Sequence, residues 1–448
     1  MNTKVLTTSK EDIKTAGEIL KNGGLVAFPT ETVYGLGANA LDGEAVKSIY
    51  TAKGRPGDNP LIVHVAEEKD IIPLVKEVTP KAQALIDAFF PAPLTVILKK
   101  SALVPDITSG GLDTVAVRMP QNEVARAVIK ASGCPIAAPS ANTSGLPSPT
   151  KAQHVIDDMT GKIDAILDGG DCEFGVESTV VTLVSDTPVI LRPGAVTKEM
   201  LEAVIGPVEL SPAVLNALGE NETAASPGMK YKHYSPRVSV TLVKGSVGRF
   251  EQLVKMRNGF ALCFEGDEIS VPHITYGKED DGLSQARELF DALRRLDETG
   301  AEKVYARAPE TSGVGMAVYN RIVRAAAFRI IDLEKPFVIG LTGPTGAGKG
   351  YVGEALSALG FRLIDSDKIS RELTADNSPL LAELQKEFGE DIVTDGVLNR
   401  ALLAERAFSD RERTDRLNAI MHPAIAERCK SEADGLSVLD APQLFEAG

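Results

Sequence analysis

Near the start of the chain stands Phe28-Pro-Thr-Glu-Thr-Val-Tyr-Gly-Leu-Gly-Ala-Asn-Ala40, in which small hydroxyls and glycines directly follow an apolar segment. That segment, Leu25 to Phe28, predicts a buried β-strand because it is short, apolar and ends at a proline. Hydroxyls offer hydrogen bonds, and glycines let a ligand approach the backbone closely. The stretch therefore predicts an α/β protein with a small-molecule site at the end of this strand.

An amphipathic helix is expected before the strand, because Ile13, Ala16 and Leu20 recur at helical spacing. Ser9 is its expected N-cap, and Asn22-Gly23-Gly24 ends it. The alternation of strands and helices continues to about residue 207 and predicts a mixed, twisted sheet with helices. The expected helices lie near 43–53, 80–89, 122–132 and 151–159, and the expected strands near 61–65, 94–99, 114–118, 135–138, 179–184 and 189–191.

Changes in composition and in the predicted secondary structure divide the rest of the chain. Residues 208–237 are polar and rich in proline, which is typical of a surface linker. Residues 238–333 return to βα alternation and predict a small Rossmann-like α/β domain. Residues 334–448 begin with a strand and a P-loop, so they predict a partial P-loop kinase α/β domain. The expected domains are therefore 1–207, 238–333 and 334–448, with 208–237 between the first two.

Composition places this chain among globular proteins. Its 448 residues are 43% hydrophobic and 25% charged, and no apolar run is long enough to span a bilayer. The four cysteines are scattered singly, and the N-terminus lacks the apolar core of a signal peptide, so we expect a cytoplasmic protein with reduced thiols and no membrane partner. The formal charge of −14 argues against broad nonspecific binding to nucleic acid.

Two further motifs point to a nucleotide site. One is Ala52-Lys53-Gly54-Arg55-Pro56-Gly57-Asp58-Asn59-Pro60-Leu61-Ile62-Val63-His64, and the other is Pro139-Ser140-Ala141-Asn142. An isolated Lys-Gly-Arg is more often a solvated basic turn, but Lys as a point charge and Arg as a planar fork also suit a triphosphate. With the first stretch, these motifs resemble the KxR and SxN signature of the YrdC-like threonylcarbamoyl-AMP synthases, in their long form with a small C-terminal domain.

The resemblance implies an enzyme that forms threonylcarbamoyl-AMP and pyrophosphate from L-threonine, bicarbonate and ATP with Mg²⁺, for the t6A modification of tRNA. Its product would pass to the tRNA threonylcarbamoyl transferase machinery. No protein metal site is implied, because Mg²⁺ accompanies the triphosphate. An RNA-binding module of the same fold is the alternative, since some members of this family contact RNA.

The resemblance also assigns residues, with Lys53 and Arg55 as the catalytic cations. It places around L-threonine the residues Thr32, His64, Arg118, Ala138 and Ser178. It places around ATP the residues Arg55, Asn59, Thr114, Ser140, Asn142, Ser148, Arg192 and Tyr231. From strand context alone, His64 is more often a satisfied core histidine. Tyr231 lies in Pro227-Gly-Met-Lys-Tyr-Lys-His-Tyr-Ser-Pro236, a segment that the long form lays across the mouth of its active site.

The last part of the chain resembles dephospho-CoA kinase. The motifs are the P-loop Gly343-Pro-Thr-Gly-Ala-Gly-Lys349, then Asp365-Ser-Asp367, and Asn418-Ala-Ile-Met-His422-Pro423. The resemblance implies a P-loop of Gly343, Gly346, Gly348, Lys349 and Gly350, with Asp367 as the catalytic base and Asp365, Arg371 and His422 as the acceptor site.

Two departures lead us to expect an inactive kinase. Gly350 stands where the P-loop usually carries a Ser or Thr that binds Mg²⁺. The chain also stops at Gly448, before the further strands, lid and arginine of that family, so we expect a truncated domain. The alternative is a working bifunctional enzyme.

Overall fold

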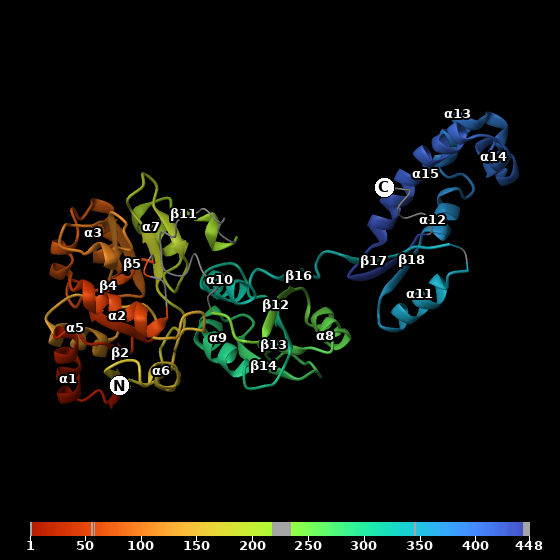
Figure 1. Ribbon diagram of the computed structural model, residues 1–448. Helices are drawn as coiled ribbons and strands as arrows, with labels where there is room; N and C mark the ends of the chain where they lie inside the picture. The colour runs from red at the N-terminus through yellow and green to blue at the C-terminus, as the bar shows by residue number, and fades with distance from the viewer. Residues whose placement is uncertain (1, 55–56, 58, 217–233, 345, 442–448) are drawn as a thin grey trace. The chain divides into compact units, whose positions relative to one another are not determined.

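The computed structural model describes residues 2–54, 57, 59–216, 234–344 and 346–441 (Figure 1). These residues form two compact units. Unit 1 consists of Met1–Val243 and Arg257–Ile331, and unit 2 consists of Lys244–Met256 and Asp332–Gly448.

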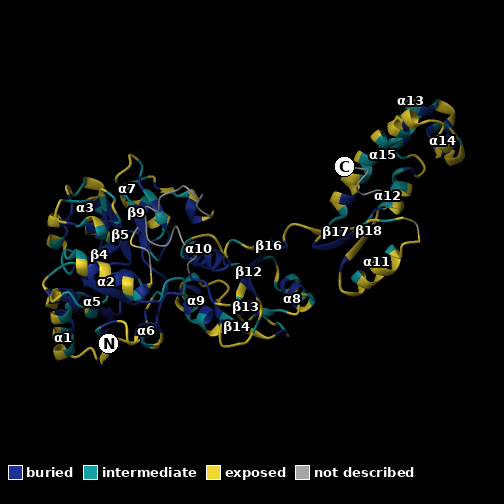
Figure 2. Ribbon diagram, in the orientation of Figure 1, coloured by how far each residue is buried: buried dark blue, intermediate teal, exposed yellow. Residues whose placement is uncertain are grey.

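A large mixed sheet organises the first part of unit 1. Its eleven strands lie in the order β1 (Lys4–Leu6), β8 (Ala165–Leu167), β2 (Val26–Phe28), β3 (Gly35–Asn39), β7 (Ile136–Ala137), β4 (Ile62–His64), β6 (Thr114–Arg118), β5 (Leu94–Lys99), β9 (Thr179–Thr182), β10 (Val189–Arg192) and β11 (Glu209–Leu210). The helices are α1 (Lys10–Lys21), α2 (Gly43–Lys53), α3 (Pro80–Phe89), α4 (Asp106–Ser109), α5 (Glu123–Ser132), α6 (Ala152–Met159) and α7 (Lys198–Ile205). Figure 2 shows the central strands buried and the outer faces of helices such as α1 and α3 exposed.

The opening stretch folds as a hairpin. β2 and β3 pair antiparallel, with Phe28 opposite Gly35, so the second half of the stretch forms a strand that was not among those predicted from the sequence. Gly37 is required there because a Cβ atom would lie 2.7 Å from the ring of Phe28. The hairpin thus brings the backbone of β3 close to a bulky core residue.

A second, smaller sheet completes unit 1. Its strands lie in the order β14 (His273–Lys278), β13 (Phe260–Glu265), β15 (Lys303–Arg307), β12 (Ser239–Lys244) and β16 (Ile330–Asp332), with helices α9 (Gly282–Leu296) and α10 (Gly315–Ala325). The pairs β13–β14, β13–β15 and β12–β15 are parallel.

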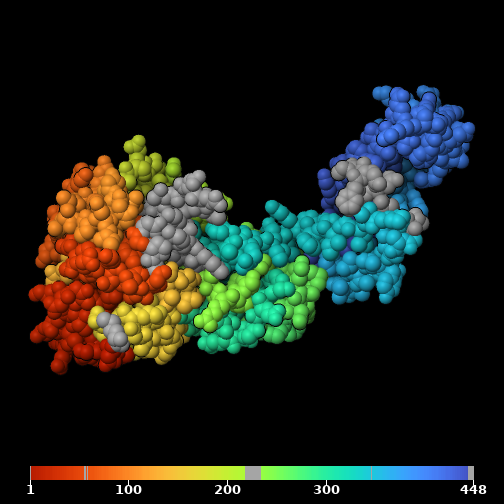
Figure 3. Space-filling model, in the orientation of Figure 1, coloured from red at the N-terminus to blue at the C-terminus, as the bar shows by residue number. Residues whose placement is uncertain are grey.

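The core of this smaller sheet reaches the opening hairpin. Val33 and Val176, from the large-sheet part, belong to the same buried cluster as Tyr234 and Phe290. In Figure 3 the surface residues near 150–170 adjoin those of the small-sheet part, which agrees with contacts between α6 and α9. The two sheet-containing parts of unit 1 therefore contact each other both at the hairpin and between α6 and α9.

Unit 2 is built on a parallel sheet of three strands. They are β17 (Phe337–Leu341), β21 (Leu436–Asp440) and β18 (Arg362–Asp365), in that order. A short hairpin joins β19 (Val393–Thr394) to β20 (Val397–Leu398). The helices of unit 2 are α8 (Val247–Met256), α11 (Lys349–Ala358), α12 (Ser366–Leu373), α13 (Leu380–Phe388), α14 (Arg400–Ala407) and α15 (Arg411–Glu432).

The prediction of a mixed α/β fold with a large twisted sheet, a small parallel sheet and a P-loop sheet is confirmed. Within the described part of the chain, no helix has the length and the apolar character that crossing a membrane requires.

Candidate functional site

A cavity in unit 1 gathers residues from distant parts of the sequence. The predicted residues among those lining it are His64, Arg118, Ala138, Ser140, Asn142, Ser148 and Arg192. Thr30, Val33, Glu177 and Tyr234 line it as well. Predicted residues for both ligands, L-threonine and ATP, thus face one space.

Other predicted residues lie around or apart from this cavity. Thr32 and Ser178 each hydrogen-bond an arginine that lines it. Lys53, Asn59 and Thr114 are not part of its lining, although the Asn59 amide is buried without a hydrogen-bond partner among the described residues. Arg55 and Tyr231 lie outside the described residues.

Arg118 stands at the end of β6, opposite His64 of the parallel strand β4. One of its terminal nitrogens donates to the Glu31 carboxylate at 2.6 Å and to the Thr32 hydroxyl at 2.9 Å. Its Nε is buried and has no partner within the described ranges. The guanidinium is therefore fixed on one side and retains a donor for an anionic group, which suits a carboxylate.

His64 is only 3% exposed. Burial first, and then the neighbouring Arg118 charge, lower its pKa to about 3. The ring is therefore neutral near pH 7, and its Nδ1 lies 3.1 Å from the carbonyl oxygen of Ile62. Because a carbonyl only accepts, Nδ1 carries the proton and Nε2 remains an acceptor.

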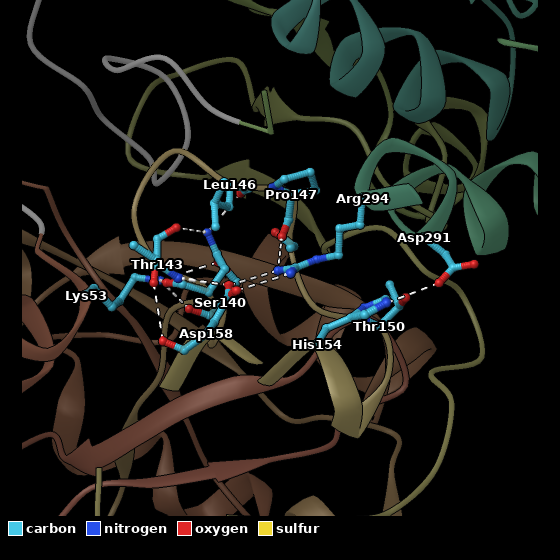
Figure 4. A network of polar contacts seen from close by, with 12 residues as sticks. Lys53, Ser140, Thr143, Leu146, Pro147, Thr150, His154, Asp158, Asp291 and Arg294 are labelled. Atoms are coloured by element: carbon cyan, nitrogen blue, oxygen red, sulfur yellow. Dashed lines mark hydrogen bonds and ion pairs between the residues drawn. The ribbon is translucent and has the colours of Figure 1, made fainter. Parts of the chain in front are cut away.

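Lys53 ends α2 and supports the loop that follows β7. The residue is 3% exposed, and its ammonium donates to the carbonyl oxygens of Ser140 and Asn142, the latter at 2.6 Å (Figure 4). The Ser140 hydroxyl in turn donates to the Asn142 amide oxygen at 2.5 Å. The structure thus places the Lys53 charge on the main chain of this loop.

Arg192 provides a second cation at the cavity. Its Nε donates to the Ser178 carbonyl at 3.0 Å, and a terminal nitrogen donates to the Ser178 hydroxyl at 3.1 Å. Burial lowers the pKa of Arg192 to about 10, with Glu177 acting in the opposite direction. The side chain remains charged at neutral pH and is held at the end of β10.

Glu177 and Tyr234 are cavity residues that sequence reasoning missed. The Glu177 carboxylate accepts from the Ser148 hydroxyl at 2.5 Å. Tyr234, in the left-handed conformation at φ 61°, stacks against Phe290 with ring centroids 5.1 Å apart. Tyr234 belongs to the same quoted segment as Tyr231, and Glu177 directly precedes the assigned Ser178, so sequence proximity was the available signal.

Unit 2 holds the second candidate site. Gly343, Gly346 and Gly348 all have positive φ values, of 137°, 85° and 86°, as the tight P-loop turn requires. Gly348 is the N-cap of α11, and the Lys349 ammonium donates to the Gly343 carbonyl at 2.9 Å. The loop therefore presents a helix N-terminus, the arrangement that binds phosphate.

The predicted acceptor residues of unit 2 are only partly brought together. Asp367 and His422 line one largely apolar cavity, whereas Asp365 and Arg371 do not. Asp365 instead caps α12 by accepting from the backbone N–H groups of residues 367 and 368. The described parts of the chain contain no group of three or more His, Cys, Asp or Glu side chains placed to hold a metal.

Comparisons with known families divide the chain in a similar way. Residues 18–194 match the Sua5_yciO_yrdC family, described as telomere recombination. Residues 196–327 match the C-terminal domain of threonylcarbamoyl-AMP synthase. Residues 337–448 match the dephospho-CoA kinase family.

Individual relatives agree with these matches. Threonylcarbamoyl-AMP synthase of Pyrococcus abyssi is 47% identical over 330 residues, which are 72% of this chain and 96% of that protein. The Bacillus subtilis protein of the same name is 46% identical over 340 residues, 73% of this chain and 97% of that protein. The crystal structure of P. abyssi Sua5 complexed with L-threonine has a TM-score of 0.70 at 45% identity and covers 74% of this chain and 99% of that one.

The kinase-like part has a shorter match. Dephospho-CoA kinase of Corynebacterium efficiens is 48% identical over 118 residues. These are 25% of this chain, which spans 59% of the length of that relative.

Proposed function

The chain belongs to the threonylcarbamoyl-AMP synthase family of nucleotidyltransferases, and we propose that unit 1 forms threonylcarbamoyl-AMP and pyrophosphate from L-threonine, bicarbonate and ATP. One observation carries the proposal. The cavity of unit 1 joins His64 and Arg118, suited to an amino acid, with Ser140, Ser148 and Arg192, suited to a nucleotide.

L-threonine binds at the Arg118 side in this proposal. The free Nε–H of Arg118 pairs with the α-carboxylate, because that donor is buried and has no other partner in the described structure. The neutral His64 accepts from the amino acid without adding a positive charge that would repel the ammonium group. Thr32, Ala138 and Ser178 complete the threonine side.

ATP binds at the side of the Ser140 loop. Ser140, Asn142 and Ser148 donate or accept without attracting competing anions, and Arg192 adds positive charge for the phosphates. Asn59, Thr114 and Arg55 are further ATP contacts in this proposal, with Tyr231 from the segment 208–237. Lys53 contributes by holding the loop carbonyls.

Mg²⁺ fits this site only as a partner of the triphosphate. The cavity carboxylate Glu177 already pairs with Arg321, and Glu31, which lies next to the cavity residue Thr30, pairs with Arg118. The phosphate oxygens would therefore hold the ion, which would neutralise charge on the departing pyrophosphate.

The reaction needs no protein nucleophile. The threonine amine and bicarbonate give a carbamate with loss of water, and a carbamate oxygen attacks the α-phosphorus of ATP as the bond to pyrophosphate breaks. The protein orients the reactants and stabilises the developing charge with fixed cations. The product then passes to the enzyme that modifies tRNA. A cytoplasmic location is part of the proposal, because all four cysteines are free thiols.

The test is product formation by the purified 448-residue protein. With ATP, Mg²⁺, bicarbonate and L-threonine, we expect equal amounts of pyrophosphate and a product with the mass of threonylcarbamoyl-AMP. Omission of threonine should abolish both. Pyrophosphate release that does not depend on threonine would contradict the proposal.

We also propose the domain bounds 1–207, 208–237, 238–333 and 334–448, the last part being a kinase-like domain without dephospho-CoA kinase activity. Gly350 supports inactivity, because it offers no hydroxyl to Mg²⁺. A bifunctional enzyme is the second candidate, favoured by Asp367 and His422 sharing one cavity. Formation of CoA from dephospho-CoA and ATP separates the two.

A further inference from the structure

Arg294, on α9 of the small-sheet part, contacts the loop that carries Ser140 and Ser148. Its two terminal nitrogens donate to the two carboxylate oxygens of Asp158, at 3.2 and 2.9 Å. One of them also donates to the carbonyl oxygen of Pro147 at 2.6 Å. Both charged side chains are largely buried, with 15% of Arg294 and 7% of Asp158 exposed. Figure 4 shows the arginine reaching the loop from the side opposite Lys53.

Asp158 also binds the other end of the loop, at Thr143. Its Oδ2 accepts from the backbone N–H of Thr143 at 3.1 Å. Arg294 therefore fixes the loop at Pro147 directly and at Thr143 through Asp158. Within the loop, the Asn142 amide donates to the carbonyl oxygens of Thr143 and Leu146, each at 2.9 Å.

The loop is thus held at defined points on two sides. Lys53 binds the carbonyls of Ser140 and Asn142 from the large-sheet part. Arg294 and Asp158 fix the segment from Thr143 to Pro147, which lies between Asn142 and Ser148. A bidentate arginine–carboxylate pair has a defined geometry. The Arg294–Asp158 pair therefore fixes where the loop lies, in addition to attracting it.

We propose that Arg294 is a positioning residue for the nucleotide, acting through Asp158 and the 143–147 loop. The inference rests on the proposed ATP placement beside Ser140, Asn142 and Ser148. It gives the small-sheet part a share in forming the active site, in addition to its packing against the large sheet. Threonine contacts at His64 and Arg118 lie on β4 and β6, outside this loop.

A neighbouring ion pair offers a matched control. Asp291, also on α9, lies 3.1 Å from Nε2 of His154 on α6 and 3.0 Å from the ammonium of Lys151. These ion pairs join α9 to α6 and its N-cap Lys151, and in the described structure their side chains make no hydrogen bond or ion pair with residues 143–147. Asp291→Asn therefore weakens the helix contact without removing a hydrogen bond to residues 143–147. His154 keeps its own contact, in which it accepts from the backbone N–H of Thr150 at 3.2 Å.

The experiment compares Arg294→Gln with Asp291→Asn in the full chain. Dissociation constants for ATP and for L-threonine are measured by calorimetry, together with the thermal midpoint. We expect Arg294→Gln to weaken ATP binding about tenfold or more, because small displacements of a positioning group are costly. Threonine binding in Arg294→Gln should change less than about twofold, because the threonine contacts lie outside the loop that Arg294 positions. Asp291→Asn should leave both dissociation constants near wild type. Arg294→Lys should recover part of the ATP affinity, because it keeps the positive charge.

Equal losses of ATP affinity in Arg294→Gln and Asp291→Asn would show that Arg294 only docks the two sheets. Unchanged ATP affinity in Arg294→Gln would overturn the inference while leaving the proposed reaction intact, provided the wild type releases pyrophosphate with threonine. If Arg294→Gln does not fold, Asp158→Asn replaces it, since the amide oxygen can still accept from Thr143 while the charge that orients Arg294 is lost.

Discussion

Arg321 of α10 donates a hydrogen bond from Nε to Oε2 of Glu177 over 2.8 Å, although 144 residues separate the two in the chain. Arg321 is fully buried, and further bonds join it to the carbonyl oxygens of Glu177 and Pro193. Glu177 in turn lines the cavity of unit 1 and holds the Ser148 hydroxyl. The small-sheet part therefore supports the proposed active site at a second point, independent of Arg294.

Replacement of Arg321 by glutamine should strongly destabilise unit 1, because it leaves the Glu177 carboxylate buried without its main partner. Loss of one member of a buried ion pair costs about 3–5 kcal/mol. The measurement is the unfolding free energy of Arg321→Gln from denaturant titration. Adding Glu177→Gln to that variant should restore part of the loss, and a double variant less stable than either single one would contradict this account.

The same pair predicts a dependence of stability on acid pH. Burial would raise the pKa of Glu177, but the charges of Arg321 and Arg192 and the Ser148 hydroxyl outweigh it and hold the pKa at about 2, below the ordinary 4.5. Because the pKa of Glu177 is lower in the folded than in the unfolded state, its ionised carboxylate stabilises the folded protein. This stabilisation is complete above pH 4.5 and is lost as the pH falls toward 2. Thermal midpoints measured over this range should fall less steeply in Glu177→Gln than in the wild type. Parallel curves would rule out this contribution.

These contacts mark what the sequence could and could not reveal. The strands at 94–99 and 114–118 and the helix at 43–53 were predictable, because each is a local apolar pattern with capping or turn residues at its ends. β1 and β8 were not predicted, since three-residue strands carry little periodicity and gain their stability from each other across 161 residues of sequence, as in the Lys4–Ala165 pair.

The candidate site divides in the same way. Residues such as Ser140 and Arg192 were named from family resemblance, and the structure places them at one cavity. The supports of these residues were invisible, because nothing local to Arg294 or Arg321 distinguishes a buried arginine from a solvated one. Pairing over more than 130 residues is a property of the folded chain.

His64 should add a second pH dependence, in a higher range. Its folded-state pKa of about 3 lies below the ordinary 6.5, chiefly because the ring is buried and next because Arg118 is near. Its contribution to stability is complete above pH 6.5 and is lost progressively as pH falls toward 3. The slope from one such group is at most about 1.4 kcal/mol per pH unit. His64→Asn should reduce the slope of the unfolding free energy against pH between pH 6.5 and 3. The same substitution at the exposed His273 should not. Equal slopes in the two variants would show that His64 is not the source of this pH dependence.

Arg192 should be essential for turnover under the proposed mechanism. Arg192→Gln keeps a donor for Ser178 but removes the charge offered to the phosphates, so threonine-dependent pyrophosphate release should fall about a hundredfold or more. Arg192→Lys should retain more activity than Arg192→Gln, because it keeps the charge. Arg295→Gln, at an exposed position on α9, is the control and should behave as wild type. Steady-state assays with all substrates saturating decide the matter, and a fully active Arg192→Gln would remove Arg192 from the phosphate site.

The P-loop of unit 2 should be dispensable for the synthase reaction and insufficient for kinase activity. Lys349→Ala should leave threonine-dependent pyrophosphate release unchanged, because the residues proposed for the synthase reaction, Arg294 included, all lie outside unit 2. The wild-type chain should form no CoA from dephospho-CoA and ATP at ordinary kinase rates, since Gly350 cannot supply the hydroxyl that binds Mg²⁺. A side chain at Gly350 meets no atom within 4 Å, so Gly350→Ser can be tested without steric conflict. If the missing hydroxyl alone prevents phosphoryl transfer, Gly350→Ser should form CoA. Adding Lys349→Ala to Gly350→Ser should abolish that activity. CoA formation by the unaltered chain would show instead that the hydroxyl is not required.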